Sequence, residues 1–210
     1  MRGWPRMLGR AALLLHGQES SPPADTATLV ARLCAGDAAA LEPLYRRESG
    51  PVYRYALALA GNPAWAADAM QDAFVAFAGR PQGFDPQRAS LGAYLAGMAR
   101  HSLLARWREA PAAAPDEQAE TDDEMPAAEH LVSPEELLVR SQAQEQVWAA
   151  LQRLPWTQRE AVVLVDLQER PYAEAARIAG VEINTLRTRL HRARLRLAAL
   201  LNTAEPGARA

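Results

Sequence analysis

The residues best suited to chemistry in this sequence lie between Ile183 and Leu197, in the stretch "INTLRTRLHRARLRL". It holds five arginines, a histidine, an asparagine and two threonines, so it offers positive charge and hydrogen-bonding groups. Arginine binds phosphates and guanine edges, and Asn, Thr and His side chains can hydrogen-bond to base edges. This composition indicates a helix that grips nucleic acid, and the alternative is a solvated arginine-rich surface.

The angular positions of these residues on a helix separate an apolar side from a polar side. At about 100° per residue, the apolar side chains fall in one narrow stripe, which comprises Leu186, Leu190, Ala193, Leu197, Leu200 and Leu201. The opposite side carries Asn184, Thr185, Thr188, His191 and Arg192, and Arg187 and Arg194 lie beside the stripe. Residues 170–196 contain seven arginines and two glutamates, although the whole chain has a net charge of -2. Such segregation suits a helix in the major groove of DNA.

Catalytic and metal-binding patterns are missing from the sequence. The four histidines (His16, His101, His130, His191) lack ligand spacing, and Cys34 is the single cysteine. Neither a nucleophile paired with a base nor a phosphate-binding glycine loop is present. We therefore expect no enzymatic activity, no cofactor and no metal site.

Turn and cap signals around the basic stretch predict a helix-turn-helix. Pro171 begins a short helix, "YAEAARIA", and Gly180 permits the left-handed turn that ends it. Asn184 or Thr185 would then cap the basic helix.

Two further helices are expected before this motif. One begins at Ser133 as N-cap with Pro134 in its first position and ends before Pro155. Thr157 and Glu160 have the spacing of a capping box that would open the next helix.

The first half of the chain shows helical periodicity as well. Asn62 and Pro63 mark a helix start, and Gly79 with Pro81 marks its end. An apolar stripe should face the core along this helix: Ala66, Met70, Ala73, Phe74 and Phe77. The side chains of Asp68, Gln71 and Asp72 share an exposed face, which is either an ordinary solvated surface or a site for a basic partner.

Another helix is expected from Leu91 to Arg108. Its Arg100, His101, Arg106 and Arg108 form a basic surface, and Trp107 lies between two of these arginines. Charge and an aromatic ring together can hold single-stranded nucleic acid. The alternative is a tryptophan that is simply buried in the core.

Composition divides the chain into parts. Hydrophobic residues make up 49% of the 210 residues, enough for two small cores. From Glu109 to Glu136 there are ten carboxylates and no arginine, which is typical of a flexible acidic linker. The apolar run from Ala11 to Leu15 is too short for a signal peptide or a membrane span, so we expect a cytoplasmic protein without membrane insertion.

Both halves resemble one family, the extracytoplasmic-function (ECF) group of bacterial RNA polymerase sigma factors. The resemblance covers about Thr28 to Arg108 and Ser133 to Leu200. In the first half, "ADAMQDAFVAF" is similar to the family's Asp-x-x-Gln-Asp/Glu-x-x-Phe helix, and "YLAGMARHSLLARWR" resembles the helix that follows it. In the second half, "ALQRLPWTQREAVVLVDL" and "YAEAARIAGVEINTLRTRLHRARLRL" resemble the domain that reads the −35 element.

The resemblance implies an all-α chain of two small helical domains joined by the acidic linker. Residues 1–24 would be a flexible extension and 25–108 the region that binds core polymerase and recognises and melts the −10 element. Residues 109–132 would be the linker, 133–201 the helix-turn-helix region that recognises the −35 element, and 202–210 a tail.

The resemblance also implies roles for individual residues. Core RNA polymerase would contact Asp68, Gln71 and Asp72. The −10 strand would contact Phe84, Arg88, Arg100, His101 and Arg108. The −35 DNA would contact Thr185, Arg187, Thr188, Arg189, His191, Arg192 and Arg194. The family often has Asn at the position of His101 and Asp at that of Ala105, so its −10 base preference does not carry over.

The partners expected from the resemblance are core RNA polymerase, promoter DNA and an anti-sigma factor, which could hold the chain at the membrane. Two other functions explain less of the sequence. A self-sufficient helix-turn-helix regulator would account for the basic helix but not for the Asp68 to Phe74 motif, and a helical adaptor would leave the arginines unexplained.

Overall fold

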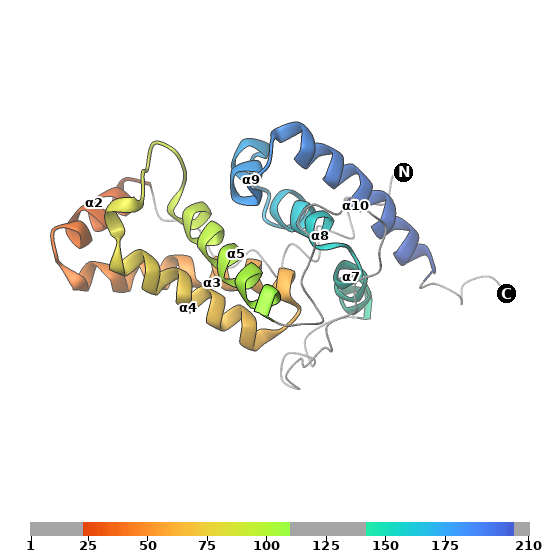
Figure 1. Cartoon of the computed structure of the whole chain (residues 1–210), viewed down its shortest axis with the longest axis horizontal. Coiled ribbons are helices and arrows are strands. Elements are labelled where there is room, and N and C mark those ends of the chain that lie inside the picture. The colour runs from red at the N-terminus through yellow and green to blue at the C-terminus, as the bar shows by residue number, and fades with distance from the viewer. Residues whose placement is uncertain (1–22, 110–141, 204–210) are drawn as a thin grey trace.

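The computed structural model describes residues 23–109 and 142–203, and within these ranges the chain is helical without a strand, as the sequence predicts (Figure 1). The predicted N-terminal extension, the acidic linker beyond Glu109, the helix start at Ser133 and Pro134 and the last seven residues lie outside these ranges. Among the described helices, none is long and apolar enough to cross a membrane.

The first bundle runs from α2 to α5. Its elements are α2 (Pro23–Cys34), a 3-10 turn η1 (Ala38–Ala40), α3 (Leu41–Ala60), α4 (Pro63–Gly79), a second 3-10 turn η2 (Pro81–Gly83) and α5 (Leu91–Glu109). Helices α3, α4 and α5 pack against one another, and α2 lies against α3. Their buried faces form the core that positions both the acidic face of α4 and the basic side chains of α5.

Helix α4 confirms the local signals in the sequence. Asn62 Oδ1 accepts hydrogen bonds from the amides of Ala64 and Trp65 at 2.9 and 3.1 Å, and Pro63 occupies the first helical position. These bonds satisfy amides that have no partner within the helix. The predicted apolar stripe is buried along its whole length: Ala66, Met70, Ala73, Phe74 and Phe77.

The second bundle runs from α7 to α10. It consists of α7 (Gln142–Gln152), α8 (Trp156–Val162), a π-helical turn η3 (Val163–Leu167), α9 (Tyr172–Ala179) and α10 (Ile183–Thr203). The predicted stripe of α10 packs on α7, α8 and α9. Leu186, Leu190, Ala193 and Leu197 are buried, whereas Leu200 and Leu201 are half-buried near the end of the helix.

Two predicted helix caps are wrong. Helix α8 follows Pro155 with no side-chain cap, because Thr157 lies inside the helix and the carboxylate of Glu160 bonds elsewhere. Helix α10 already begins at Ile183, so Asn184 and Thr185 belong to its first turn. The Leu186 amide donates to the Glu182 carbonyl at 3.0 Å, which places the helix start earlier than the sequence indicated.

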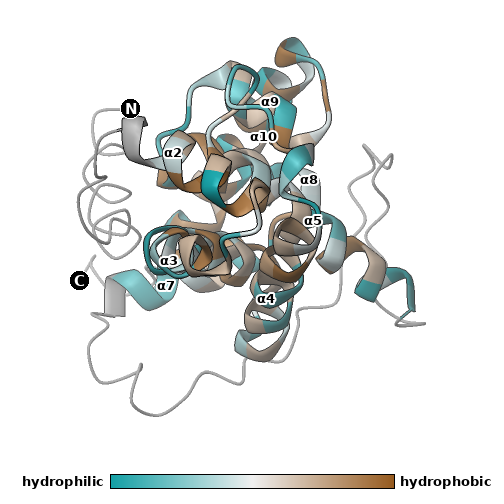
Figure 2. Ribbon diagram, turned by 90° about the vertical axis from the view of Figure 1, so that its left-hand side faces the viewer, coloured by the Kyte–Doolittle hydropathy of each residue, from teal (hydrophilic) through white to brown (hydrophobic). Residues whose placement is uncertain are grey.

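The two bundles pack directly against each other. Helix α5 of the first bundle lies against α9, and α3 contacts α7, α8 and η3. Figure 1 shows α8 and α9 beside α5, although they are separated from it by more than 40 residues of sequence. In Figure 2 hydrophobic and hydrophilic residues alternate along the ribbons of both bundles, as expected for helices with one buried side.

Candidate nucleic-acid interface

Helix α10 presents the polar side that its sequence predicts. Asn184, Arg187, Thr188, His191 and Arg192 are exposed, opposite the buried leucines. Nearby bonds hold some of these groups in place: Arg187 Nη1 donates to Asn184 Oδ1 at 3.2 Å, and Thr188 Oγ1 donates to the Asn184 carbonyl at 3.0 Å. A row of arginine, threonine and histidine side chains on an exposed helix can reach both phosphates and base edges.

The other predicted DNA-contacting residues of α10 are less exposed to solvent. Thr185 and Arg189 are half-buried. Arg194 pairs with Asp166 of η3 at 2.5 and 3.0 Å, and this hydrogen-bonded carboxylate raises the pKa of Arg194. Arg194 therefore links α10 to η3, and in this it differs from the exposed arginines of the helix.

The helix-turn-helix places α10 relative to α9. Gly180 ends α9 with a φ of 68°, a left-handed conformation that glycine adopts without the steric penalty of a side chain. The Arg187 guanidinium lies 5.6 Å from the centre of the Tyr172 ring, so an aromatic residue of α9 supports one arginine of α10. Tyr172 was not among the predicted site residues.

On the acidic face of α4, Gln71 and Asp72 are exposed, as predicted, whereas Asp68 is half-buried, and both aspartates already have partners on α5. Asp68 pairs with Arg106 at 2.9 Å, and Asp72 accepts a hydrogen bond from Ser102 at 2.6 Å. Gln71 is exposed, and so is Val75 in the next turn, whose relative accessibility is 73%. The surface is therefore acidic with an apolar neighbour, a combination that fits a protein partner.

The basic residues of α5 divide into exposed and buried groups. His101 and Arg108 are exposed, and Arg88 is exposed in the loop before the helix. Arg100 retains only 8% of its accessible surface, and its Nε donates to Glu160 Oε1 of α8 at 2.8 Å. Phe84 is buried as well, with its ring 5.5 Å from that of Tyr94.

Trp107 is a buried core residue, the second of the two alternatives that the sequence left open. It is buried, and its ring centre lies 4.2 Å from that of Trp156 in the second bundle and 6.0 Å from that of Trp65. Its ring faces protein on two sides, so Trp107 is a packing residue in this arrangement.

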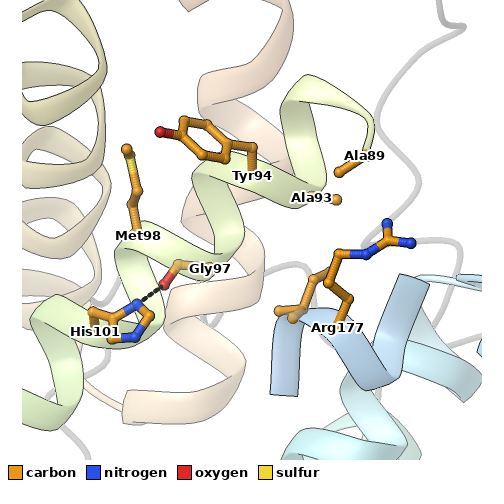
Figure 3. A pocket seen from close by; sticks show the side chains of 8 residues that line it. Ala89, Ala93, Tyr94, Gly97, Met98, His101 and Arg177 are labelled. Carbon is orange, nitrogen blue, oxygen red and sulfur yellow. Dashed lines mark hydrogen bonds between the residues drawn. The ribbon is translucent and has the colours of Figure 1, made fainter. Parts of the chain in front are cut away.

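Two clefts lie between α5 and the helix-turn-helix. One, of about 200 Å³, is lined mainly by apolar groups, with His101 on α5 and Arg177 on α9 at its edges (Figure 3). In it, His101 Nδ1 lies 2.7 Å from the Gly97 carbonyl. The other, of about 470 Å³, brings Arg100, His101 and Arg108 of α5 together with Arg189 of α10. The structure thus places residues from both predicted DNA-contacting sets around one cavity.

The sequence analysis did not predict the contact between charged residues of the two bundles. Burial raises the pKa of Glu160, and the neighbouring Arg100 acts in the opposite direction. Burial also lowers the pKa of Arg159 to about 10. The sequence does hold a signal for Glu160, because helical spacing places it between two apolar residues, Trp156 four positions before and Leu164 four positions after, and the structure buries both.

A metal site has no support in this part of the chain. Across residues 23–109 and 142–203, no cluster of three or more His, Cys, Asp or Glu side chains could hold a metal ion.

Comparisons with known proteins match both halves of the chain. The family model for sigma-70 region 2 matches residues 44–111, and that for sigma-70 region 4 matches residues 144–197. The ECF RNA polymerase sigma factor SigM of Mycobacterium tuberculosis is 35% identical over 181 residues, which cover 86% of this chain and 87% of SigM. The ECF sigma factor BldN of Streptomyces coelicolor is 32% identical over 173 residues, covering 82% of this chain and 64% of BldN.

Two solved structures share the fold. One is the sigma factor RpoE of Bartonella quintana in complex with the anti-sigma factor NepR, with a TM-score of 0.60 and 24% identity over 77% of this chain and 96% of RpoE. The other is CnrH in complex with the cytosolic domain of CnrY, with a TM-score of 0.62 and 22% identity over 85% of this chain and 98% of CnrH.

Proposed function

The chain belongs to the extracytoplasmic-function (ECF) family of RNA polymerase sigma factors, and on this premise we propose that it directs core RNA polymerase to promoters. It binds the core enzyme, recognises the −35 and −10 elements and promotes melting of the DNA. It does so by binding alone, as a non-enzymatic factor in the bacterial cytoplasm.

The observation that carries the DNA-reading role is the exposed polar side of α10. Arg187, Thr188, His191 and Arg192 project from the side of α10 that points away from the core, and the glycine turn sets this helix against α9. We assign −35 recognition to this side, with Thr185 and Arg189 at its edge. Arg194 is paired with Asp166, so it holds α10 against η3 and contributes less to DNA binding than the exposed residues do.

The first bundle supplies the other two contacts. The face of Asp68, Gln71 and Asp72 binds core polymerase, with Val75 as an apolar anchor beside it. The α5 surface and the preceding loop hold the melted −10 strand through His101, Arg108 and Arg88, together with Phe84 and Arg100 once they become accessible. Bases separated during melting need such a charged and aromatic surface to offset the cost of unpairing.

An anti-sigma factor is the expected regulator of the chain. Support comes from the similarity in fold to the sigma factor RpoE, whose structure was solved in complex with the anti-sigma factor NepR.

The experiment that tests the function is transcription in vitro. The chain is mixed with core polymerase and sheared genomic DNA of the bacterium that encodes it, and transcripts are compared with those from core alone. Discrete transcripts that require the chain support a sigma factor. Tight sequence-specific DNA binding without core polymerase, and no new transcript with it, would instead support a self-sufficient regulator.

A further inference from the structure

Arg187, the first arginine of α10, is held in place by two uncharged groups. Its Nη1 donates to Asn184 Oδ1 at 3.2 Å, and its guanidinium lies 5.6 Å from the centre of the Tyr172 ring. No carboxylate pairs with it in the part of the chain that the structure describes. Arg194 of the same helix, by contrast, pairs with Asp166. The two arginines are therefore held by different means, one by a charge and the other by a ring and an amide.

A guanidinium with uncharged neighbours keeps its charge for DNA. A carboxylate would compete with phosphates and base edges for the same N–H donors, whereas a ring face and an amide oxygen leave the positive charge in place. Arginine presents its donors in a planar fork, and the bond to Asn184 leaves most of them available. Two parallel donors are enough to bind O6 and N7 of guanine, the commonest specific contact of arginine in the major groove. Arg187 is thus oriented without being neutralised.

Tyr172 is the first residue of α9, and the fold fixes its backbone. Pro171 precedes it with a φ of −55°, and the Pro171 carbonyl accepts hydrogen bonds from the amides of Glu174 and Ala175 at 2.9 Å. Helix α9 packs against α10 (Figure 1). It is anchored in the core by four buried residues: Ala175, Ala176, Ile178 and Ala179. The Tyr172 ring itself has a relative accessibility of 36%, so it contacts Arg187 at the surface.

A second arginine of α10 lies close to the same tyrosine. Arg194 follows Arg187 by about two helical turns, so both side chains leave the helix on nearly the same side. The hydrogen bond to Asp166 raises the pKa of Arg194, partial burial opposes this, and the nearby Tyr172 contributes less than Asp166 in the upward direction. Tyr172 therefore lies beside both arginines, and Asp166 fixes the one that is farther along the helix.

An arginine at this position gains from support, because it lies at the edge of the exposed side of α10 and not at its centre. The side chain is long and flexible, and binding DNA costs the rotamer freedom that it loses. The Tyr172 ring occupies the space toward α9, so fewer orientations remain for the Arg187 guanidinium. Part of the ordering cost then falls on folding rather than on DNA binding.

We propose that Tyr172 is a positioning residue for −35 recognition, and that its ring holds the Arg187 guanidinium in the orientation in which Arg187 reads a guanine in the major groove. This inference rests on the proposed function. Tyr172 acts through Arg187 and does not itself bind a base. Specificity at one base pair of the −35 element then depends on a residue of α9, which lies outside the recognition helix.

Tyr172→Leu and Tyr172→Phe test the proposal in holoenzyme formed from the full chain and core polymerase. Leucine removes the ring, whereas phenylalanine keeps the ring and removes only the hydroxyl. The probe is promoter DNA in which each guanine of the −35 element is replaced in turn by 7-deazaguanine, which lacks the N7 acceptor. One such replacement should weaken binding by about fivefold or more with the unchanged chain and with Tyr172→Phe. The same replacement should weaken binding by less than about twofold with Tyr172→Leu.

Arg187→Met separates a positioning role from a structural one. When Arg187 is present, Tyr172→Leu should weaken promoter binding by about two- to fivefold, the size expected for an exposed contact between a cation and a ring. In an Arg187→Met chain no guanidinium is left to position, so Tyr172→Leu should cause no further loss. A structural role of Tyr172 would give the same loss in both backgrounds.

NMR of the free chain reports the contact without any partner. Protons that lie over the face of an aromatic ring resonate upfield. The δ and ε protons of Arg187 should therefore be shifted upfield in the unchanged chain and in Tyr172→Phe, and they should return to ordinary values in Tyr172→Leu. The same protons of Arg192, which is exposed on another side of α10, are the control and should not change.

The outcomes separate this proposal from the proposed function. Equal losses of promoter binding with Tyr172→Leu and Tyr172→Phe would make the hydroxyl the active group and would overturn the proposal. An unshifted Arg187, a −35 element in which no guanine responds to 7-deazaguanine, or equal losses in the two Arg187 backgrounds would overturn it as well, and the sigma-factor function would stand. A chain with a shifted Arg187 that binds no promoter together with core polymerase would overturn the proposed function and, with it, the role of Tyr172.

Discussion

Replacing Arg159 by methionine should strongly destabilise the second bundle. The Arg159 guanidinium is almost fully buried and makes four hydrogen bonds, to the carbonyls of Leu59, Gln152 and Leu154 and to the Gln152 side chain, at 2.6 to 3.1 Å. Three of these four bonds lie within the second bundle, where they satisfy carbonyls at the end of α7.

The magnitude follows from the balance of these bonds against the burial of the charge. Charge-assisted hydrogen bonds contribute roughly 1.5 to 3 kcal/mol each, so four of them contribute on the order of 6 to 12 kcal/mol. The burial that lowers the pKa of Arg159 to about 10 costs roughly 3 kcal/mol. Methionine removes both contributions and leaves buried carbonyls without donors. The difference is about 3 to 9 kcal/mol, and because four bonds from one guanidinium do not add fully, we expect a loss near the lower end, about 4 kcal/mol, in the free energy of unfolding.

The assay is urea unfolding followed by the far-UV circular dichroism of the helices. The control is Arg153→Met, because Arg153 is exposed just beyond the end of α7 and its replacement should change stability by less than about 0.5 kcal/mol. If Arg159→Met costs under about 1 kcal/mol, or no more than the control, then Arg159 does not hold the end of α7 as described.

Three further predictions concern binding and stability. The double change Asp68→Arg and Asp72→Arg should weaken core polymerase binding by about tenfold or more, in a fluorescence titration, because it reverses the charge of the acidic face. Arg192→Ala should weaken −35 DNA binding by about 1 to 3 kcal/mol, measured by titration with duplexes altered at single base pairs, and the loss should depend on sequence if Arg192 reads a base. Gly180→Ala should cost about 1 to 2 kcal/mol in urea unfolding, because φ is 68° there and no atom crowds the new Cβ. Gly79→Ala, at an equally uncrowded helix end without a positive φ, should cost less than Gly180→Ala.

Each of these variants has a matched control or an outcome that contradicts it. Glu42→Arg reverses an exposed charge on α3 outside the acidic face and should leave core affinity unchanged; equal losses in both variants would remove the role of Asp68 and Asp72. A sequence-independent loss for Arg192→Ala would make Arg192 a phosphate contact. If Gly180→Ala and Gly79→Ala cost the same, the left-handed turn is not what requires glycine.

The sequence predicts those features that depend on neighbouring residues. Asn62 and Pro63 begin α4 because capping involves amides two and three residues away, and the stripe of α10 is visible because helical periodicity repeats within a few turns. The exposed side of α10 follows from the same periodicity. These local rules account for the helices and for the most accessible part of the candidate site.

The contact between the bundles depends on residues that are far apart in sequence. Glu160 lies 60 residues from Arg100 and 105 from Tyr55, so no local pattern connects them, and the same Glu160 fits a capping box by spacing alone. The buried contact took precedence over the cap, because a carboxylate with two donors in a core is better satisfied than one beside a solvated helix start. Arg100 reads as a surface residue in sequence for the same reason.

The central claim, that this chain selects promoters for RNA polymerase, is tested most directly by sequencing the 5′ ends of transcripts made by core polymerase with the chain on genomic DNA. A promoter-selecting sigma factor should produce discrete start sites that are absent with core alone, each preceded by two shared sequence elements centred about 10 and 35 base pairs upstream. Start sites identical to those of core alone, or discrete sites without a shared pair of upstream elements, would contradict it.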